Sequence, residues 1–214
     1  MTTAQGKKGI LFIISAPSGT GKTSLVRSLC NHDPNLHISI SYTTRPPRKD
    51  EIPDVSYHFT DEARFQDMII ADAFLEFATV FDHHYGTPRD WVERHLASGR
   101  DVALEIDWQG AMQIRRSLPD TVNIFMLPPS FQALEQRLHG RGDDDKTVRR
   151  RMRGARIELS HYHEYEYLMV NETFDQALLE LETIVRAARL KYTLQKSYYD
   201  DLANLLMEQA GNIE

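Results

Sequence analysis

The residues best suited to chemistry form a glycine-rich loop near the start of the chain. Residues 16–23 read Ala-Pro-Ser-Gly-Thr-Gly-Lys-Thr, a Walker A pattern with alanine in place of its first glycine. Glycines let backbone N–H groups turn toward phosphate oxygens, and a helix that starts near Lys22 directs its positive end at the anion. Lys22 would reach the β- and γ-phosphates of a nucleoside triphosphate, and the Thr23 hydroxyl would bind Mg²⁺. The predicted triphosphate-binding residues are Ala16, Pro17, Ser18, Gly19, Thr20, Gly21, Lys22 and Thr23.

This loop alone does not separate a kinase from a GTPase, an ATPase or a motor. The alternative is a chance Gly-Lys-Thr in a loop that opens a helix. The apolar run 10–14 before the loop and the helical pattern after it favour the phosphate loop.

A second stretch suited to phosphate recognition lies between residues 41 and 48. Arg45 and Arg48 flank the consecutive prolines Pro46 and Pro47. Arginine binds phosphate through planar contacts from several N–H groups, and prolines reduce the entropy that the backbone loses on binding. The alternative is an exposed turn whose arginines contact only water.

The elements that must position these residues follow a strand–helix alternation. Apolar runs at 10–14, 101–106, 122–127 and 167–170 are predicted strands, and helical patterns follow them. The first run does not alternate with polar residues, which is typical of a strand buried on both faces. The alternation predicts an α/β fold with a parallel sheet flanked by helices.

Two stretches interrupt the alternation. Residues 38–92 contain short strand patterns and one helix, for which Thr60 is the predicted N-cap, and should form a small mixed or antiparallel insertion. Residues 137–160 are highly charged and predict a mobile helical hairpin. The remaining segments, 1–37, 93–136 and 161–214, should form one core, so the 214 residues make a single domain.

Composition excludes several classes of protein. The chain has 25 lysine and arginine residues against 31 aspartate and glutamate residues, a formal charge of −6, which argues against a protein that neutralises nucleic-acid phosphates. No apolar stretch approaches the roughly 20 residues of a membrane span. Cys30 is the one cysteine, which fits a reducing compartment. We therefore expect a cytoplasmic protein with no membrane partner.

Several segments in order make the sequence resemble bacterial guanylate kinases over almost its whole length. This resemblance implies a P-loop core, a GMP-binding insertion at 38–92 and a lid at 137–160, with ATP as phosphoryl donor and Mg²⁺ as cofactor. The segments that carry it are 18–23, 41–48, Glu51 with Tyr57 and Phe59, 74–76, 85–87, 105–110, 127–130, 137–142 and 170–171.

The resemblance implies one set of residues for GMP. Glu76 and Thr87 would read the guanine: a carboxylate accepts from its N1 and N2 donors, and a hydroxyl donates to O6. Alternatively, Glu76 is a polar residue at a strand edge, and Thr87 caps a helix with Pro88 at its first position. Tyr57 and Tyr85 could equally be core aromatics. The implied GMP-binding residues are Ser41, Arg45, Arg48, Tyr57, Glu76, Tyr85, Gly86, Thr87 and Asp107.

Asp107 is also the favoured magnesium residue beside Thr23, directly or through water. It follows a buried strand at the usual place of a Walker B acid, with Glu105 two residues before it. The alternative is an N-cap of the helix that follows, before Trp108.

The resemblance also implies residues for ATP and for catalysis. Arg137, Arg141 and Arg151 match lid arginines that close on the ATP phosphates, and Asn171 matches a position near the adenine. Arg149 and Arg150 are interpreted as a solvated helix face. The implied catalytic residues are Lys22, Arg45, Arg137, Arg141 and Arg151.

The expected function is transfer of the γ-phosphoryl group of ATP to GMP. One alternative is a P-loop kinase for another phosphorylated small molecule; another is a catalytically silent module that binds a phosphopeptide. Asp50 and Asp54 replace two glycines usual in the family, so we expect weaker GMP binding. The expected partners are nucleotides and no nucleic acid, and a homo-oligomer is left open.

Overall fold

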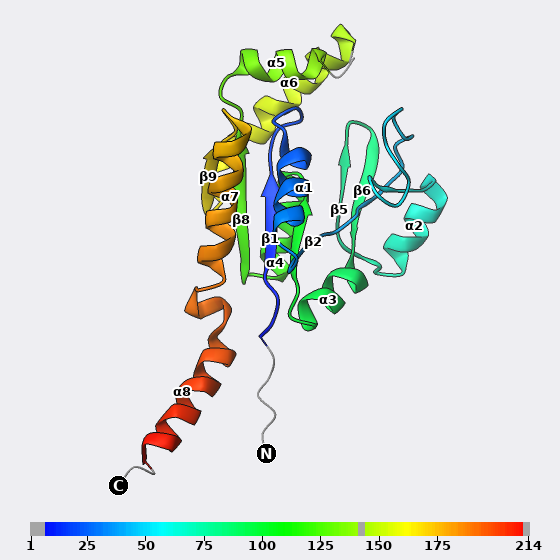
Figure 1. Cartoon of the computed structure of the whole chain (residues 1–214). Coiled ribbons are helices and arrows are strands. Elements are labelled where there is room, and N and C mark those ends of the chain that lie inside the picture. Colours follow the sequence, from blue (N-terminus) through cyan, green and yellow to red (C-terminus); the bar gives the residue numbers. More distant parts are fainter. Residues whose placement is uncertain (1–6, 141–143, 212–214) are drawn as a thin grey trace.

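The computed structural model describes residues 7–140 and 144–211, and its centre is a parallel five-stranded sheet (Figure 1). The strands lie in the order β2 (Leu36–Ile38), β7 (Asp101–Glu105), β1 (Leu11–Ser15), β8 (Thr121–Leu127) and β9 (Tyr167–Val170). All neighbours are parallel, and Leu11 pairs with Val102 on one side and Thr121 on the other. The predicted α/β class and parallel sheet are confirmed.

Strand β1 is buried on both faces, as its unbroken apolar run predicts. Phe12 and Ile14 pack on one face with α1 (Lys22–His32) and α7 (Phe174–Ala188). Leu11 and Ile13 pack on the other face with α3 (Arg89–Ala97) and α4 (Trp108–Ser117). Alternate side chains of a strand point to opposite faces, so β1 contributes to both hydrophobic layers. Its position fixes where its carboxyl end leads into the glycine-rich loop 16–23, which we call the P-loop.

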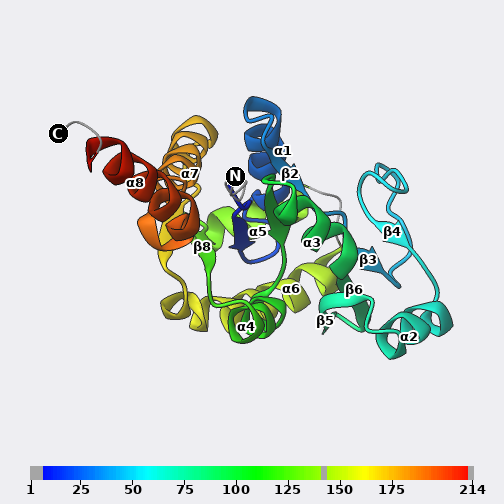
Figure 2. The ribbon, with the colours of Figure 1, turned by 90° about the horizontal axis from the view of Figure 1, so that it is seen from below.

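The insertion is a second, mixed sheet beside the core (Figure 2). Its order is β4 (His58–Phe59), β3 (Tyr42–Thr43), β6 (His83–Pro88) and β5 (Phe74–Val80), with β3 parallel to β4 and antiparallel to β6. Helix α2 (Glu62–Ile70) follows β4. The prediction of a small mixed insertion is confirmed.

Two local predictions within this region are wrong. Ile38, the expected first residue of the insertion, is instead the last residue of the core strand β2, and the first insertion strand begins at Tyr42. The N-cap of α2 is Asp61, whose side chain accepts from the Arg64 N–H at 2.8 Å. Thr60 instead extends the sheet pairing, because its N–H donates to the Thr43 carbonyl.

A helical hairpin lies at the end of the sheet where the P-loop emerges (Figure 1). It consists of α5 (Phe131–His139) and α6 (Asp145–Ser160), joined by a small apolar cluster, and we call it the lid. Helix α5 starts earlier than the expected lid boundary at 137. The cluster residues are Leu134, Leu138, Val148 and Ala155.

The described part of the chain beyond Phe174 is helical, as the sequence pattern there predicts. After α6 come the short 3₁₀ helix η1 (Tyr162–Glu164), β9, α7, a second 3₁₀ helix η2 (Tyr192–Leu194) and α8 (Lys196–Gly211). Helix α8 extends away from the sheet (Figure 1). Within the described ranges, no helix combines the length and apolar character needed to span a bilayer.

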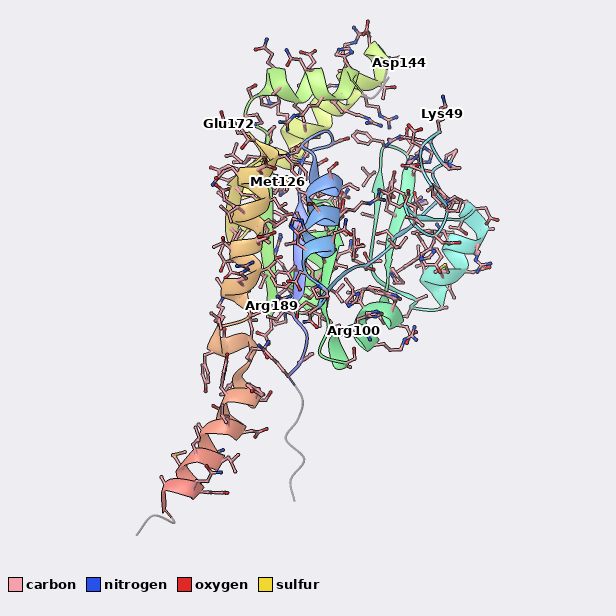
Figure 3. The ribbon with its side chains drawn as sticks, in the orientation of Figure 1. Lys49, Arg100, Met126, Asp144, Glu172 and Arg189 are labelled. Atoms are coloured by element: carbon pink, nitrogen blue, oxygen red, sulfur yellow. The ribbon has the colours of Figure 1, made fainter. Side chains whose placement is uncertain are left out.

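Arg189, which lies at the end of α7 (Figure 3), joins this helix to the sheet through an ion-pair network. Its guanidinium lies 2.6 Å from Asp33 and 2.7 Å from Asp101. The Asp101 side chain is 4% exposed and also accepts from the Ile10 N–H at 2.7 Å. Burial opposes ionisation of Asp33, but its hydrogen bond with Arg189 prevails and holds the pKa of that carboxyl below its usual value.

Replacing Arg189 with alanine should therefore destabilise the fold. Asp101 would remain buried without its cation, and we expect the free energy of unfolding to fall by roughly 3 kcal/mol in urea titrations. Arg186→Ala is the control, because Arg186 is exposed and lies 3.8 Å from Glu182. Its expected loss is below about 1 kcal/mol. Equal losses for both variants would contradict the assigned role of the network.

Candidate functional site

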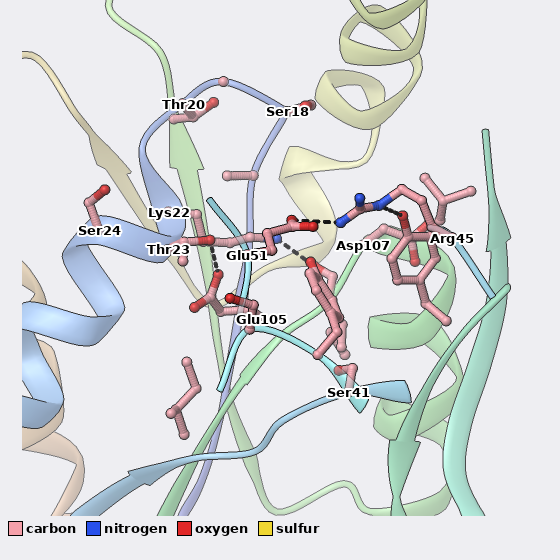
Figure 4. Close-up of a pocket in the computed structure, with 18 of the residues that line it drawn as sticks. Ser18, Thr20, Lys22, Thr23, Ser24, Ser41, Arg45, Glu51, Glu105 and Asp107 are labelled. Carbon is pink, nitrogen blue, oxygen red and sulfur yellow. Dashed lines mark hydrogen bonds and ion pairs between the residues drawn. The ribbon is translucent and has the colours of Figure 1, made fainter. Parts of the chain in front are cut away.

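A cleft of about 430 Å³ opens where the core, the insertion and the lid meet (Figure 4). Its walls come from the P-loop, the segment 38–41, the insertion, the carboxyl end of β7 and helix α6. Ligands of open α/β sheets bind in such a crevice at the carboxyl ends of the strands.

The P-loop takes the backbone conformation that its glycines allow. Gly19 and Gly21 have φ values of 95° and 97°, in the left-handed region. Helix α1 begins at Lys22, whose Nζ donates to the Ile106 carbonyl at 3.3 Å. The hydroxyl of Thr23 donates to Oε2 of Glu105 at 2.6 Å (Figure 4). The first turn of α1 therefore presents its N-terminus, an ammonium group and a hydroxyl on one side of the loop.

The backbone carbonyl of Thr20 is held by two residues that were expected to contact ATP. Asn171 Nδ2 donates to this oxygen at 2.6 Å and Arg137 at 3.1 Å, and Arg137 also reaches the Asn171 carbonyl at 3.1 Å. Neither residue lines the cleft. A Cβ at Gly21 would lie 2.5 Å from Asn171 Nδ2, so Asn171 packs directly against the loop. Both residues shape the P-loop from behind; Arg141 lies outside the described residues.

The two acids at the carboxyl end of β7, Glu105 and Asp107, have different surroundings. Glu105 contacts Thr23, as described above, whereas Asp107 is the N-cap of α4. The Asp107 carboxylate accepts from the Gly110 N–H at 3.0 Å and from Gln109 Nε2 at 2.9 Å. Both acids line the cleft. Asp107 therefore caps α4, as the alternative interpretation predicted. Glu105, which was not the favoured magnesium residue, instead contacts the Thr23 hydroxyl that is expected to bind Mg²⁺.

On the insertion side of the cleft, Arg45 is held in one orientation. It lies 2.7 Å from Glu51, and its Nε donates to the Tyr85 hydroxyl at 3.2 Å. Glu51 also accepts from the Arg48 N–H at 2.8 Å. Burial opposes ionisation of Glu51, but the hydrogen bond from Arg45 prevails and lowers its pKa. Burial raises the pKa of the neighbouring Tyr57 to about 12, so its hydroxyl keeps its proton.

The other residues that the sequence predicts for the GMP phosphate, and the two aspartates near them, differ in whether they line the cleft. Ser41, Arg48 and Tyr57 line the cleft with Arg45 and Tyr85. Asp50 lines it as well, whereas Asp54 lies outside the lining and pairs with His58 at 2.7 Å. Asp54 has a φ of 62°, so this aspartate does adopt the left-handed turn of the glycine it replaces, and Asp50 does not.

A buried acid–hydroxyl pair lies deeper in the insertion. The Thr87 hydroxyl donates to Oε1 of Glu76 at 2.5 Å, and the two residues are 0% and 4% exposed. Burial raises the pKa of Glu76 to about 7; Asp107 adds to the shift and the Thr87 hydrogen bond opposes it. A Cβ at Gly110 would lie 2.3 Å from Oε2 of Glu76, so that glycine makes room for the carboxylate.

The alternative reading of Thr87 as a helix cap is wrong. Thr87 belongs to β6, and α3 begins at Arg89 with Pro88 as its N-cap. Pro88 has a ψ of 115°, so the chain is still extended there. Gly86, which does not line the cleft, lies under Phe74: a Cβ there would meet the ring at 2.7 Å.

Helix α6 brings two side chains to the cleft, and the sequence reasoning missed one of them. Arg151 lines the cleft as expected and is 9% exposed, and Glu158 lines it from two helical turns further on. Burial raises the pKa of Glu158 to about 7, with Lys22 opposing the shift and Asp107 adding to it. A single glutamate in a charged segment belongs to no recognisable sequence motif. Glu158 follows Arg151 by seven residues and Ala155 by three, however, and this spacing places the three residues on one face of a helix.

Comparisons with known proteins agree on one family. A family model described as guanylate kinase matches residues 8–188. The guanylate kinase of Methylococcus capsulatus is 55% identical over 86% of this chain and 90% of its own. That of Coxiella burnetii is 51% identical over 94% of this chain and 98% of its own. The crystal structure of guanylate kinase from Anaplasma phagocytophilum matches with a TM-score of 0.75 at 30% identity, covering 90% of this chain and 92% of that one.

The raised pKa of Glu76 predicts a pH-dependent effect on stability. The unfolded chain ionises this carboxyl near pH 4.5 and the folded chain near 7, so folding loses stability between these values and the cost persists above them. Glu76→Gln removes the charge, and we expect urea titrations to show a gain over the parent of roughly 2 kcal/mol at pH 8 and little at pH 4.5.

Glu51→Gln provides a control with the opposite sign. The pKa of Glu51 is lowered in the fold, so its charge stabilises the protein above the unfolded pKa, and the variant should be less stable at pH 8. If Glu76→Gln instead loses stability at pH 8, the conclusion that the ionised Glu76 carboxylate is buried at a cost to folding would be wrong.

Proposed function

The chain belongs to the guanylate kinase family. From this premise we propose which of its residues bind ATP and GMP and which promote phosphoryl transfer between them. The protein is an ATP:GMP phosphotransferase that yields ADP and GDP. The observation that carries the residue assignment is that Lys22 of the P-loop and the buried Glu76 line the same cleft. Donor and acceptor would therefore meet between the core, the insertion and the lid.

The insertion is the proposed site for GMP. Guanine offers N–H donors at N1 and N2, which Glu76 would accept, and an O6 acceptor, to which Thr87 would donate. Adenine has an acceptor at N1 and would leave the carboxylate unpaired. A site that leaves a buried polar group unpaired rejects the wrong base by several kcal/mol. The observed Thr87–Glu76 hydrogen bond, 2.5 Å long, supports this assignment because it holds both groups at one place. When guanine binds, the Thr87 hydroxyl would turn its single proton from Glu76 to O6, and Glu76 would accept from N1 and N2 instead.

The phosphate of GMP would lie against Arg45. Glu51 and Tyr85 hold the Arg45 guanidinium in one orientation, which reduces the entropy lost on binding an anion. Arg48 stands beside it with a half-exposed side chain. The other proposed contacts are the hydroxyls of Ser41, Tyr57 and Tyr85.

The P-loop and the lid are the proposed site for ATP and Mg²⁺. The Thr23 hydroxyl and the Glu105 carboxylate lie together at the cleft, and such hard oxygen donors fit Mg²⁺ with the remaining positions left to water and phosphate oxygens. The ion, when bound, would neutralise charge on the β- and γ-phosphates. Thr23 and Glu105 are therefore the proposed magnesium residues, and Lys22 and Arg151 the proposed phosphate contacts of this chain.

This arrangement needs no strong protein base. The attacking group is a phosphate oxygen, which is mostly ionised at neutral pH because the second pKa of a phosphate monoester is about 6. The difficulty is to bring two polyanions together in line, so positioning and charge neutralisation by Lys22, Arg45 and Arg151 would supply most of the rate. Closure of the lid would exclude water, which otherwise hydrolyses ATP.

The two alternatives from the sequence fit the structure less well. A silent phosphopeptide-binding module has no use for the P-loop, whereas Lys22 and Thr23 are both in place at the cleft. A kinase for another small molecule has no use for a buried Glu76 beside Thr87. The cytoplasmic location remains a prediction, and a homo-oligomer remains an open possibility.

A panel of nucleoside monophosphates tests the acceptor. With ATP and Mg²⁺ and coupled detection of ADP, we expect GMP to exceed AMP, UMP and CMP by at least about a hundredfold in kcat/KM. Lys22→Ala should lower kcat by roughly a thousandfold with an unchanged circular dichroism spectrum. A preference for another monophosphate would refute the assignment of Glu76, and substantial residual turnover in Lys22→Ala would refute that of the lysine.

A titration with Mg²⁺ distinguishes the roles of Glu105 and Asp107 at the carboxyl end of β7. Glu105→Gln should raise the Mg²⁺ concentration for half-maximal rate by about tenfold, since it weakens a proposed ligand. Asp107→Asn is the matched comparison: asparagine also caps helices, so we expect a change below about twofold in this measurement. The reverse ranking would return the magnesium role to Asp107.

A further inference from the structure

The tip of the β5–β6 hairpin touches the lid. Residues Phe81 and Asp82 form this tip, and Asp82 lies 2.5 Å from the Arg150 guanidinium on α6. The same guanidinium stands 5.4 Å from the centre of the Phe81 ring, within range of a cation–π interaction. Figure 1 shows the tip of the β5–β6 hairpin at the same end of the molecule as α6. Arg150, expected from the sequence to be solvated, thus connects two separate parts of the chain.

Gly154 makes close packing possible at this hairpin–lid contact. It lies on α6 one turn after Arg150, and a Cβ there would be 2.9 Å from Phe81 Cζ and 3.1 Å from Cε1. Real Cβ atoms do not approach a ring carbon so closely, so the ring would have to shift. Glycine is also a poor residue for a helix interior, which suggests that contact with Phe81 outweighs helix propensity at this position.

The backbone of the tip is strained for the residues it carries. Phe81 and Asp82 have φ values of 49° and 67°, the left-handed region that a two-residue hairpin turn requires. Asn-Gly makes such turns with little strain, whereas a bulky side chain there is unusual. The turn does not require a phenylalanine. We attribute the residue at this position to the contact of its ring with α6 and to its place at the edge of the cleft.

The contact joins the elements that carry the two proposed nucleotide sites. Strand β5 carries Glu76, and β6 carries Tyr85 and Thr87. Helix α6 carries Arg151, which is next to Arg150 and lines the cleft. A movement of the hairpin relative to the lid therefore changes the distance between the acceptor residues and the donor-side arginine.

We propose that Phe81, Asp82, Arg150 and Gly154 form a latch between the GMP-binding insertion and the lid, which positions Arg151 over the cleft and makes the binding of each nucleotide favour the other. This inference rests on the proposed assignment of the two nucleotide sites. Coupling of this kind is reciprocal: GMP strengthens binding of the donor by the same factor as the donor strengthens binding of GMP. The Asp82 and Arg150 side chains are 80% and 46% exposed, so the ion pair contributes modestly and the coupling is shared with the Phe81 contact.

Gly154→Ala separates the latch from a structural role. The added methyl group displaces the Phe81 ring, and the gain in helix propensity offsets part of the lost contact, so the free energy of unfolding should stay close to that of the parent. Calorimetry with GMP and a non-hydrolysable ATP analogue should show each affinity alone within about twofold of the parent. The factor by which one nucleotide strengthens the other should fall by about fivefold.

Charge reversal tests the ion pair. Asp82→Arg and Arg150→Asp should each reduce the coupling factor, and the double variant should recover part of it. Arg149→Ala is the matched control, because it removes an exposed arginine one position away and should leave the coupling unchanged. An unchanged coupling factor in both Gly154→Ala and Asp82→Arg would overturn the latch.

Failure of the latch and failure of the site assignment have different signatures. Glu76→Gln should bind GMP more weakly than the parent when no ATP analogue is present, which tests the assigned acceptor site. The latch variants should retain that affinity and lose only the coupling. A latch variant that binds GMP alone as weakly as Glu76→Gln does would count against the latch, because its residues would then act within the binding site.

Discussion

The cleft depends on how the carbonyl of Thr20 is held. A loop that turns its N–H groups toward phosphate must leave its carbonyl groups facing the protein, where each needs a donor. Asn171 and Arg137 supply the donors to this oxygen, at 2.6 and 3.1 Å. Asn171 follows β9 and Arg137 lies on α5, so one backbone atom connects the P-loop to the sheet and to the lid. The position of α1, and with it Lys22 and Thr23, follows from this arrangement.

The charges of the cleft explain how an acidic protein can bind two polyanions. Its formal charge is −6, but its carboxylates are sorted by their neighbours. Glu51 is paired with Arg45 and has a lowered pKa, so it orients the cation. Burial instead raises the pKa of Glu76 and Glu158 to about 7, so part of their negative charge is absent at neutral pH. Local pairing and burial, rather than net charge, set the field that a nucleotide meets.

Close approaches at glycines shape both ends of the cleft. Gly110 leaves room for the Glu76 carboxylate, and Gly154 leaves room for the Phe81 ring. In each case a side chain from the insertion packs against a helix that belongs to another part of the molecule. The insertion is therefore fitted to α4 at its base and to α6 at its tip, and these contacts define its distance from the P-loop.

The sequence by itself determined the parts that depend on local patterns. The run 10–14, the glycines of the loop and the alternation of strands and helices predict β1, the P-loop and the parallel sheet, because burial on both faces and left-handed turns restrict residue types directly. Motif resemblance also located Glu76 beside Thr87. Only the tertiary structure decided that Glu105 rather than Asp107 contacts Thr23, that Arg137 and Asn171 hold the loop from behind, and that Arg150 reaches Asp82. These contacts join residues 68 to 151 positions apart, and their partners follow from how the layers pack, which no local pattern encodes.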